Sequence, residues 1–266
     1  MQKLLSLYNI ILPNFHKPNK MKIVVFDLDE TLGYFVEFGI FWDSLSIYIS
    51  KYLNKELTQD DFNSVMDLYP EFLRPNIINI LNYLKNKKIN KVCQKIMIYT
   101  NNQGSRKWTS HIISYFETKI NHYKLFDQII SAFKINGKQV EFCRTTNNKT
   151  YKDFIRCTKL PMNAEICYVD DTFYPEMAND NIYYINIKPY VHSLPFNEIY
   201  KRFLESNIGK RLIDKEAMNY FIDFMKKKIH LYNFTVVKKN EDDYKIDCIL
   251  SKRILQHLYE FFNEKK

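Results

Sequence analysis

The sequence predicts an α/β fold in which helices flank a central parallel sheet. Short apolar, β-branched runs such as Lys22–Phe26 are typical of strands that are buried on both faces, as in parallel sheets. Segments with helical periodicity separate these runs, and strands that alternate with helices build right-handed crossover units. The 266 residues are enough for one such domain with a sizeable core and an added part.

Three predicted strands end in polar residues. The polar clusters are residues 27–31, 100–102 and 170–171, and a fourth strand is expected at 181–187. Helices are expected over 76–85 and 108–123, between the first three strands. In parallel sheets, ligands bind beyond the carboxyl ends of the strands. We therefore expect the three polar clusters to meet at one edge of the sheet.

The chain divides into three predicted parts. Residues 1–20 form an N-terminal tail, 21–204 the α/β core, and 205–266 a mostly helical C-terminal extension. Within the core, residues 33–74 have helical periodicity, and Thr58 is a candidate helix cap. Because this insert follows the first strand directly, we expect it to lie over the polar edge as a small cap, the alternative being that it packs beside the sheet.

Composition narrows the class of partner. Lys and Arg number 39 against 30 Asp and Glu, a formal net charge of +9. This excess favours an anionic partner, such as a phosphorylated protein, another phosphate ester or nucleic acid, and an ordinary basic surface explains it equally well. Hydrophobic residues make up 46% of the chain, which excludes intrinsic disorder. No apolar run approaches the ~20 residues that a membrane span needs, so no membrane contact is expected.

The cysteines indicate the redox compartment. Five cysteines are spread over the chain without a Cys-x-x-Cys pair or metal-binding spacing. This pattern predicts reduced, mostly buried thiols in an intracellular protein of the cytoplasm or nucleus.

The first polar cluster suggests phosphoryl chemistry. Asp27 and Asp29 are two residues apart, so at the end of a strand their side chains point to the same side. Carboxylates of this kind suit Mg²⁺, which bridges protein to phosphate oxygens. One carboxylate can attack phosphorus to give an aspartyl-phosphate while the other protonates the leaving oxygen.

The other clusters supply the remaining groups. Thr100 and Asn101 can offer a hydroxyl and backbone donors to a phosphoryl group, and a lysine can neutralise its charge. Lys149 and Lys152 are both candidates for that lysine. The paired acids Asp170 and Asp171 complete the metal site, because adjacent carboxylates repel each other unless a cation is near.

The order of these residues resembles that of a known superfamily. Asp-x-Asp-x-Thr, then Thr, Lys and Asp-Asp, each at the end of a strand, resembles the haloacid dehalogenase (HAD) superfamily of phosphohydrolases. The strings "DLDETL", "LRP", "TYKDFIRCTKLP" and "YVDD" resemble more narrowly the FCP/SCP (NLI-interacting-factor-like) C-terminal-domain phosphatases. The resemblance spans roughly residues 21 to 190 and implies a Rossmann-like core.

The resemblance also implies roles for individual residues. Asp27 would be the nucleophile and a metal ligand, and Asp29 the general acid and base whose backbone carbonyl also binds Mg²⁺. Thr31 would brace the turn. Thr31 and, from its place beside Thr100, Asn101 are also expected to bind the substrate. The other residues with implied roles are Thr100, which would bind the phosphoryl group, Lys152, which would neutralise it, and Asp170 and Asp171, which would hold the metal directly or through water.

The expected function is that of a Mg²⁺-dependent phosphatase with a phosphoserine or phosphothreonine protein as substrate. The sequence departs from the subfamily in carrying Asp171, followed by Thr172 and Phe173, where members usually have Asn and a Ser-Pro-like step. Its insert is also helical where members usually have strands. Two alternatives stay open: a phosphatase of small-molecule or nucleic-acid phosphomonoesters, and a catalytically silent binding module.

Overall fold

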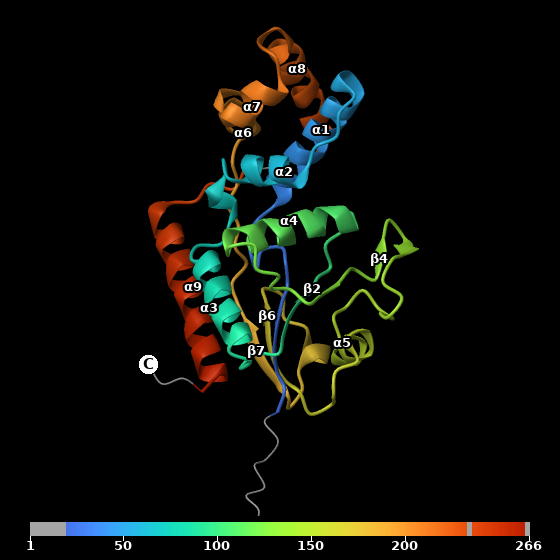
Figure 1. Ribbon diagram of the computed structural model, residues 1–266, viewed down its shortest axis with the longest axis vertical. Coiled ribbons are helices and arrows are strands. Elements are labelled where there is room, and N and C mark those ends of the chain that lie inside the picture. Colours follow the sequence, from blue (N-terminus) through green and yellow to red (C-terminus); the bar gives the residue numbers. More distant parts are fainter. Residues whose placement is uncertain (1–19, 233–235, 264–266) are drawn as a thin grey trace, which may run out of the picture.

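A five-stranded parallel sheet forms the centre of the protein in the computed structural model, which describes residues 20–232 and 236–263 (Figure 1). The strand order is β3-β2-β1-β6-β7, and all neighbours run parallel. This confirms the predicted α/β class. The strands are β1 (Lys22–Phe26), β2 (Lys95–Tyr99), β3 (Gln128–Ile130), β6 (Glu165–Asp170) and β7 (Ile182–Asn186).

Both faces of the sheet are buried, because successive residues of a strand point to opposite sides. In β1, Val24 and Phe26 belong to one hydrophobic core, and Ile23 and Val25 belong to the other. The first core is completed by residues of α3 (Ile77–Ile89), α4 (Arg106–Lys119) and α9 (Glu241–Phe261), and the second by residues of α5 (Tyr151–Thr158) and η2 (Pro175–Met177). The β-branched run of β1 is therefore apolar because neither face of the sheet meets water there.

The insert after β1 is helical, as predicted. It contains α1 (Val36–Leu53), α2 (Gln59–Met66) and η1 (Pro70–Phe72). Thr58 caps α2: its hydroxyl accepts a hydrogen bond from the backbone N–H of Asp61, whose side chain bonds back to the Thr58 N–H. This capping box satisfies donors that a helix start leaves free.

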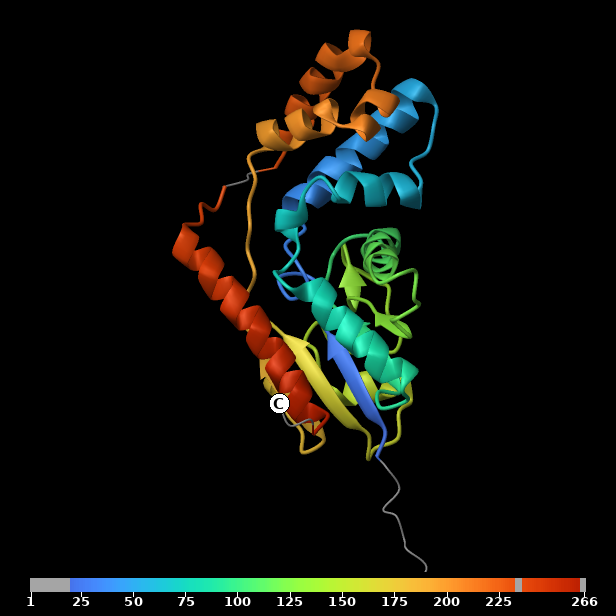
Figure 2. The same ribbon diagram turned by 60° about the vertical axis from the view of Figure 1, so that its left-hand side comes forward.

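The insert does not stand alone, because part of the C-terminal region packs against it. The helices α6 (Phe196–Glu205), α7 (Asn207–Leu212) and α8 (Met218–Ile229) join α1 and α2, with η3 (Lys215–Ala217) before α8. Phe41 of α1 meets Phe203 of α6 at 5.4 Å between ring centroids, and Tyr48 meets Phe221 of α8 at 5.0 Å. We call α1, α2, α6, α7 and α8 the helical layer; it lies beyond the carboxyl ends of the strands (Figures 1 and 2).

The last helix, α9, returns to the core. It lies beside α3 in both views, and the rings of Tyr83 and Tyr259 are 4.8 Å apart (Figures 1 and 2). The Lys22 ammonium at the start of β1 donates to the backbone carbonyl of Phe261 at 2.5 Å. The residues after 204, expected as one extension, thus serve two places: α7 and α8 in the helical layer, and α9 on the sheet domain.

A short hairpin lies between β3 and α5. It consists of β4 (Lys134–Ile135) and β5 (Lys138–Gln139), joined by Asn136 and Gly137, both with positive φ. Glycine tolerates that backbone conformation without steric cost.

The expectation that all cysteines are reduced is wrong for one pair. Cys143 and Cys157, which are 14 positions apart in the sequence, form a disulfide with 5.0 Å between their Cα atoms. The folding of α5 against the preceding loop brings them together, and no short sequence motif signals this. Cys93 and Cys167 are buried and free, and Cys248 is partly exposed.

Two further expectations concern the N-terminal tail and the crossing of a membrane. The predicted tail at residues 1–20 falls, apart from Lys20, outside the described residues. Among the helices that the structure describes, none combines the length and the apolar character that crossing a bilayer requires.

Gly209 of α7 is a stability test of the helical layer. A Cβ at this position would lie 1.8 Å from the backbone carbonyl oxygen of Phe203, and backbone cannot rotate away as a side chain can. We expect Gly209→Ala to lower the free energy of unfolding by about 1 to 3 kcal/mol, although alanine normally favours a helix. Urea denaturation measures this, and the exposed neighbour Lys210→Ala should change stability by less than about 0.5 kcal/mol. A stabilised Gly209→Ala protein would contradict the packing described.

Candidate active site

The predicted polar clusters meet at the carboxyl edge of the sheet. Asp27 directly follows β1, Thr100 directly follows β2, and Asp170 is the last residue of β6. Because β1 lies between β2 and β6, these three strand ends are neighbours. Asp27, Thr100 and Asp170 all line one cleft of about 1090 Å³.

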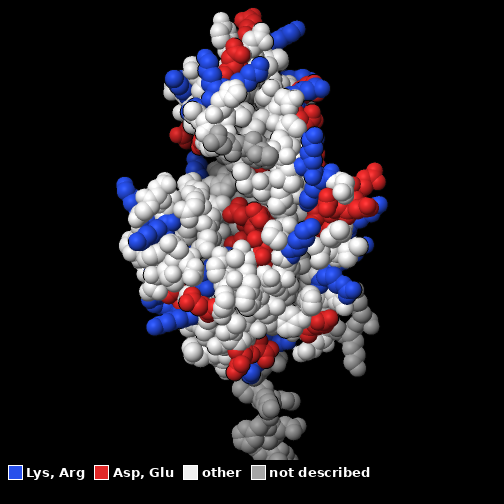
Figure 3. All heavy atoms as spheres, turned by 180° about the vertical axis from the view of Figure 1, so that it is seen from behind, with Lys and Arg blue, Asp and Glu red and all other residues white. Residues whose placement is uncertain are grey.

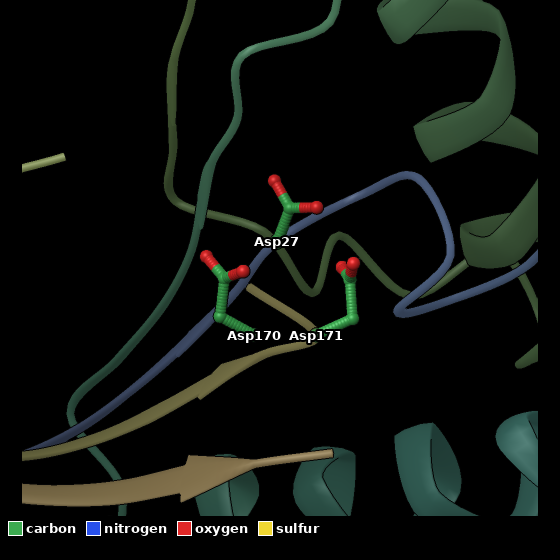
Figure 4. Close-up of side chains that lie close together, drawn as sticks. All are labelled: Asp27, Asp170 and Asp171. Atoms are coloured by element: carbon green, nitrogen blue, oxygen red, sulfur yellow. The ribbon is translucent and has the colours of Figure 1, made fainter. Parts of the chain in front are cut away.

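Three carboxylates form the centre of the site. Asp27, Asp170 and Asp171 each offer an oxygen within 4.8 Å of the others (Figure 4). Asp27 is 7% exposed and Asp170 1% exposed. Hard divalent cations prefer such carboxylate oxygens, so the donor set suits Mg²⁺.

The carboxylate of Asp29 does not belong to this group of three in the part of the chain that the structure describes. It accepts a hydrogen bond at 2.7 Å from the amide of Asn102, and burial raises its pKa. Asp29 also lines the cleft. Its side chain is thus held at the cleft by Asn102, a residue for which the sequence suggested no separate role.

Lys149 is the lysine that reaches the acids. Its ammonium lies 2.5 Å from Asp27 Oδ1 and 2.6 Å from Asp170 Oδ2, and its side chain is 2% exposed. Lys152, the residue favoured by the resemblance, lies exposed on α5 and is absent from the lining of the cleft. One turn of α5 explains the difference: Lys149 precedes the N-cap Thr150, whereas Lys152 is already inside the helix.

The site holds more carboxylates than ammonium groups, and the pKa of Asp27 is shifted. Burial raises the pKa of Asp27 to about 7, with repulsion from Asp170 adding to it, although Lys149 lowers it. The two carboxylates hold the pKa of Lys149 above its ordinary value. Lys149 therefore stays charged, while three clustered carboxylates and one ammonium leave negative charge that a divalent cation would balance.

Thr31 links the first strand end to the third. Its hydroxyl donates to Asp171 Oδ1 at 3.0 Å and accepts from the Asp171 backbone N–H at 3.2 Å. Thr31 is 1% exposed, so the structure gives it the bracing position and leaves its hydroxyl little access to a substrate.

The loop after β2 is arranged by hydrogen bonds. Thr100 Oγ1 accepts from the Asn102 backbone N–H at 3.0 Å. The Asn101 amide donates to the Tyr174 hydroxyl at 3.1 Å, and both residues line the cleft. Thr100 and Asn101 thus line the same cleft as the acids, from the end of β2.

Arg74 is a buried brace that sequence reasoning treated only as part of the "LRP" string. It is 1% exposed and donates to the backbone carbonyls of Glu30 at 2.5 Å, Thr31 at 2.6 Å and Lys188 at 2.9 Å. Glu30 has a positive φ of 57°, an uncommon conformation that these bonds help to hold. Arg74 therefore fixes the turn that carries Asp29.

Arg144 braces the segment that leads to Lys149, which we call the lysine segment. Nothing in the sequence pattern indicated this role. Its guanidinium is buried and donates to the carbonyls of Thr100 at 3.1 Å and Ser131 at 2.8 Å. It also donates to the carbonyls of Asn147 at 3.0 Å and Asn148 at 3.2 Å, directly before Lys149. One side chain thus ties Thr100 to the backbone of the lysine segment.

The cleft is acidic on a basic protein. Its lining includes the acids Asp27, Asp29, Glu30, Asp43, Asp170 and Asp171 but, among Lys and Arg, only Lys149 in the described residues. Figure 3 shows acidic side chains gathered in a hollow between the helical layer and the sheet domain. The net charge of +9 is therefore carried elsewhere on the molecule.

Comparison with models of known protein families gives no match, and comparison with curated proteins gives none.

The pKa of Asp27 predicts a stability that depends on pH. Its folded pKa, about 7, lies above the ordinary 3.8, so the folded protein keeps a proton that the unfolded chain has released. This stabilisation is present below about pH 4 and is lost as the pH rises through about 7. In EDTA, wild-type protein should lose roughly 2 to 4 kcal/mol more stability between pH 5 and pH 8 than Asp27→Asn does. Urea denaturation at both pH values measures it.

The matched control is Asp60→Asn, because Asp60 is exposed in the first turn of α2. This variant should show the same pH slope as wild type. An equal slope in Asp27→Asn and wild type would contradict the raised pKa.

Proposed function

We propose that the protein is a Mg²⁺-dependent phosphohydrolase that acts on phosphomonoesters through an aspartyl-phosphate. The observation that carries the proposal is the meeting of Asp27, Asp170 and Asp171 with the ammonium of Lys149 at the carboxyl edge of a parallel sheet. Carboxylates for a metal, one of them a nucleophile, together with a fixed positive charge are what phosphoryl transfer requires.

The order of the motifs supports the same reaction. Asp-x-Asp-x-Thr, Thr, Lys and Asp-Asp follow one another as in the HAD superfamily, and each of these groups lies at or near the end of a strand or the start of a helix at the same edge. The proposal assigns the lysine role to Lys149 in place of Lys152. The finer assignment to the FCP/SCP phosphatases remains a proposal from the motif strings alone.

Asp27, Asp170 and Asp171 would hold the metal, directly or through water. Bound Mg²⁺ would neutralise charge on the phosphate oxygens and lower the cost of bringing a phosphate dianion next to carboxylates. The donor set fits, because three carboxylate oxygens lie within 4.8 Å of one another.

The chemistry of the chain itself takes two steps. A carboxylate oxygen of Asp27 attacks phosphorus, the bond from phosphorus to the ester oxygen breaks, and Asp29 gives its proton to the leaving oxygen. In the second step Asp29 takes a proton from water, the water oxygen attacks phosphorus, and the bond to Asp27 breaks to release phosphate. The raised pKa of Asp29 suits a group that must hold a proton before the first step.

Thr100 and Lys149 would stabilise the negative charge that spreads over the phosphoryl group during transfer. The ammonium of Lys149 is buried, so its charge is little screened by water and needs no reorganisation when the transition state forms. Thr100 faces the same space from the end of β2.

The substrate class divides between a phosphoserine or phosphothreonine protein and a smaller phosphomonoester. An open groove would favour a protein, whereas helices over the nucleophile favour a small molecule. Val36, Gly39, Ile40 and Asp43 of α1 line the same cleft as Asp27, so one wall of the cleft belongs to the helical layer. This wall favours the small phosphomonoester.

A generic aryl phosphate tests the reaction. We expect the protein to hydrolyse p-nitrophenyl phosphate with Mg²⁺, to lose activity in EDTA, and to regain it on addition of Mg²⁺. Asp27→Asn should lower kcat by at least about 10³-fold, because the amide cannot replace the attacking carboxylate.

The rival function is a binding module without catalysis. Turnover by wild-type protein no faster than the background rate with every phosphate ester tried would favour that rival. Trapping of a phosphorylated Asp27 by rapid acid quench and mass spectrometry would support the covalent step directly.

Lys149 and Lys152 form a matched pair for the charge assignment. We expect Lys149→Ala to lower kcat by about 10²- to 10³-fold, since it removes the buried ammonium beside Asp27. Lys152→Ala should stay within about 2-fold of wild type, because its side chain is exposed on α5. Steady-state kinetics with p-nitrophenyl phosphate decides between them, and the opposite ranking would overturn the assignment of Lys149.

A further inference from the structure

A second pocket adjoins the catalytic cleft. It has a volume of about 490 Å³ and lies between α1 and the start of α4. It shares four lining residues with the catalytic cleft, so the two spaces are neighbours with a common wall: Gly39, Asp43, Gly104 and Trp108. We call it the tryptophan pocket.

Two indole rings form part of the wall of this pocket. Trp42 and Trp108, the only two tryptophans of the chain, both line it, together with Leu57. Trp42 is 6% exposed and packs edge-on against Phe62 at 5.0 Å. The other lining residues are mostly polar, and a pocket of this size that combines apolar surface with polar groups is typical of small-molecule sites.

The position of Trp108 depends on two glycines. A Cβ on Gly39 of α1 would lie 3.3 Å from the Trp108 ring, and one on Gly104 would lie 2.7 Å from it. The indole also packs against Phe38 at 6.0 Å and Phe62 at 5.9 Å. Trp108 is therefore fixed where the sheet domain meets the helical layer, as a wall that both spaces share.

The charges around the pocket favour an uncharged ligand. Asp43 and Glu56 are balanced by Lys55 and Lys107, so with a neutral His111 the lining carries no net charge. The catalytic cleft next to it is acidic. The pocket therefore offers no excess of positive charge to a polyanion such as an oligonucleotide, whereas an uncharged ring system needs none.

We propose that the tryptophan pocket binds the leaving group of the substrate, and that this leaving group carries an uncharged aromatic ring system. The inference rests on the proposed phosphohydrolase activity and extends it to the substrate class: a small aromatic phosphomonoester whose phosphate lies at Asp27. Planar ring systems stack on indoles with favourable geometry and bury apolar surface there. Trp108 is a binding residue for this group.

Filling the pocket tests the inference. Ser46 lines the tryptophan pocket but not the catalytic cleft, and its hydroxyl donates to the backbone carbonyl of Trp42 at 2.8 Å. Ser46→Phe should lower kcat/KM for 4-methylumbelliferyl phosphate, which has a two-ring leaving group, at least about 10-fold. It should leave kcat/KM for acetyl phosphate, whose leaving group is too small to reach the pocket, within about 2-fold of wild type.

The matched control is Ser110→Phe. Ser110 is exposed on α4 and lines neither space, so both substrates should behave as with wild type. Ser50→Phe, at an exposed position of the pocket rim, provides a second filled pocket should Ser46→Phe not fold. Equal losses for both substrates in the filled variants, or no loss for either, would overturn the inference.

Binding without turnover gives an independent readout. Because both tryptophans line the pocket, 4-methylumbelliferone should quench the intrinsic tryptophan fluorescence of wild type and Ser110→Phe saturably, and that of Ser46→Phe much less. Equal quenching in all three proteins would overturn the pocket assignment. Absence of hydrolysis of every phosphate ester, with selective quenching retained, would count against the proposed function and leave the aromatic pocket supported.

A phosphoserine peptide is the competing substrate in the same assays. Hydrolysis of the peptide at a higher kcat/KM than the aryl phosphate, unchanged in Ser46→Phe, would overturn the inference in favour of a protein substrate.

Discussion

The ammonium of Lys149, buried between Asp27 and Asp170, is the interaction on which the site depends. An unpaired charge in this position would be strongly unfavourable, and two carboxylates without it would repel each other. The pairing connects β1, β6 and the segment before α5, which are far apart in sequence. It places two buried carboxylates and a fixed positive charge within hydrogen-bonding distance of one another.

Two buried arginines support the loops that carry this arrangement. In the described residues, Arg74 and Arg144 form no ion pair. Both donate hydrogen bonds to backbone carbonyls of the loops that carry the site. Loops at the ends of parallel strands have carbonyls without sheet partners, and a buried guanidinium can satisfy several at once. The loops are thereby rigid enough to hold Asp29 and Lys149 in place.

The sheet and its polar edge could be predicted from sequence because both follow from local rules. The β-branched run ending at Phe26 and the acids at 27, 29, 170 and 171 needed only periodicity and the geometry of parallel sheets. The choice between Lys149 and Lys152 could not be made, because it depends on the residue at which α5 begins. The roles of Arg144 and of the Cys143–Cys157 bond arise from tertiary contacts that leave no local pattern. The joining of α7 and α8 to the insert was equally invisible, since helix periodicity does not say which partner a helix meets.

The construction of the helical layer from two separate stretches of chain limits how it can move. The polypeptide passes between the layer and the sheet domain four times: before α1, after α2, before α6 and after α8. A lid on a single pair of hinges swings freely, but here any large rotation would have to bend four connections together. A ligand of the cleft between the sheet domain and the helical layer would therefore enter through its open side, and the width of that opening would limit the size of the ligand.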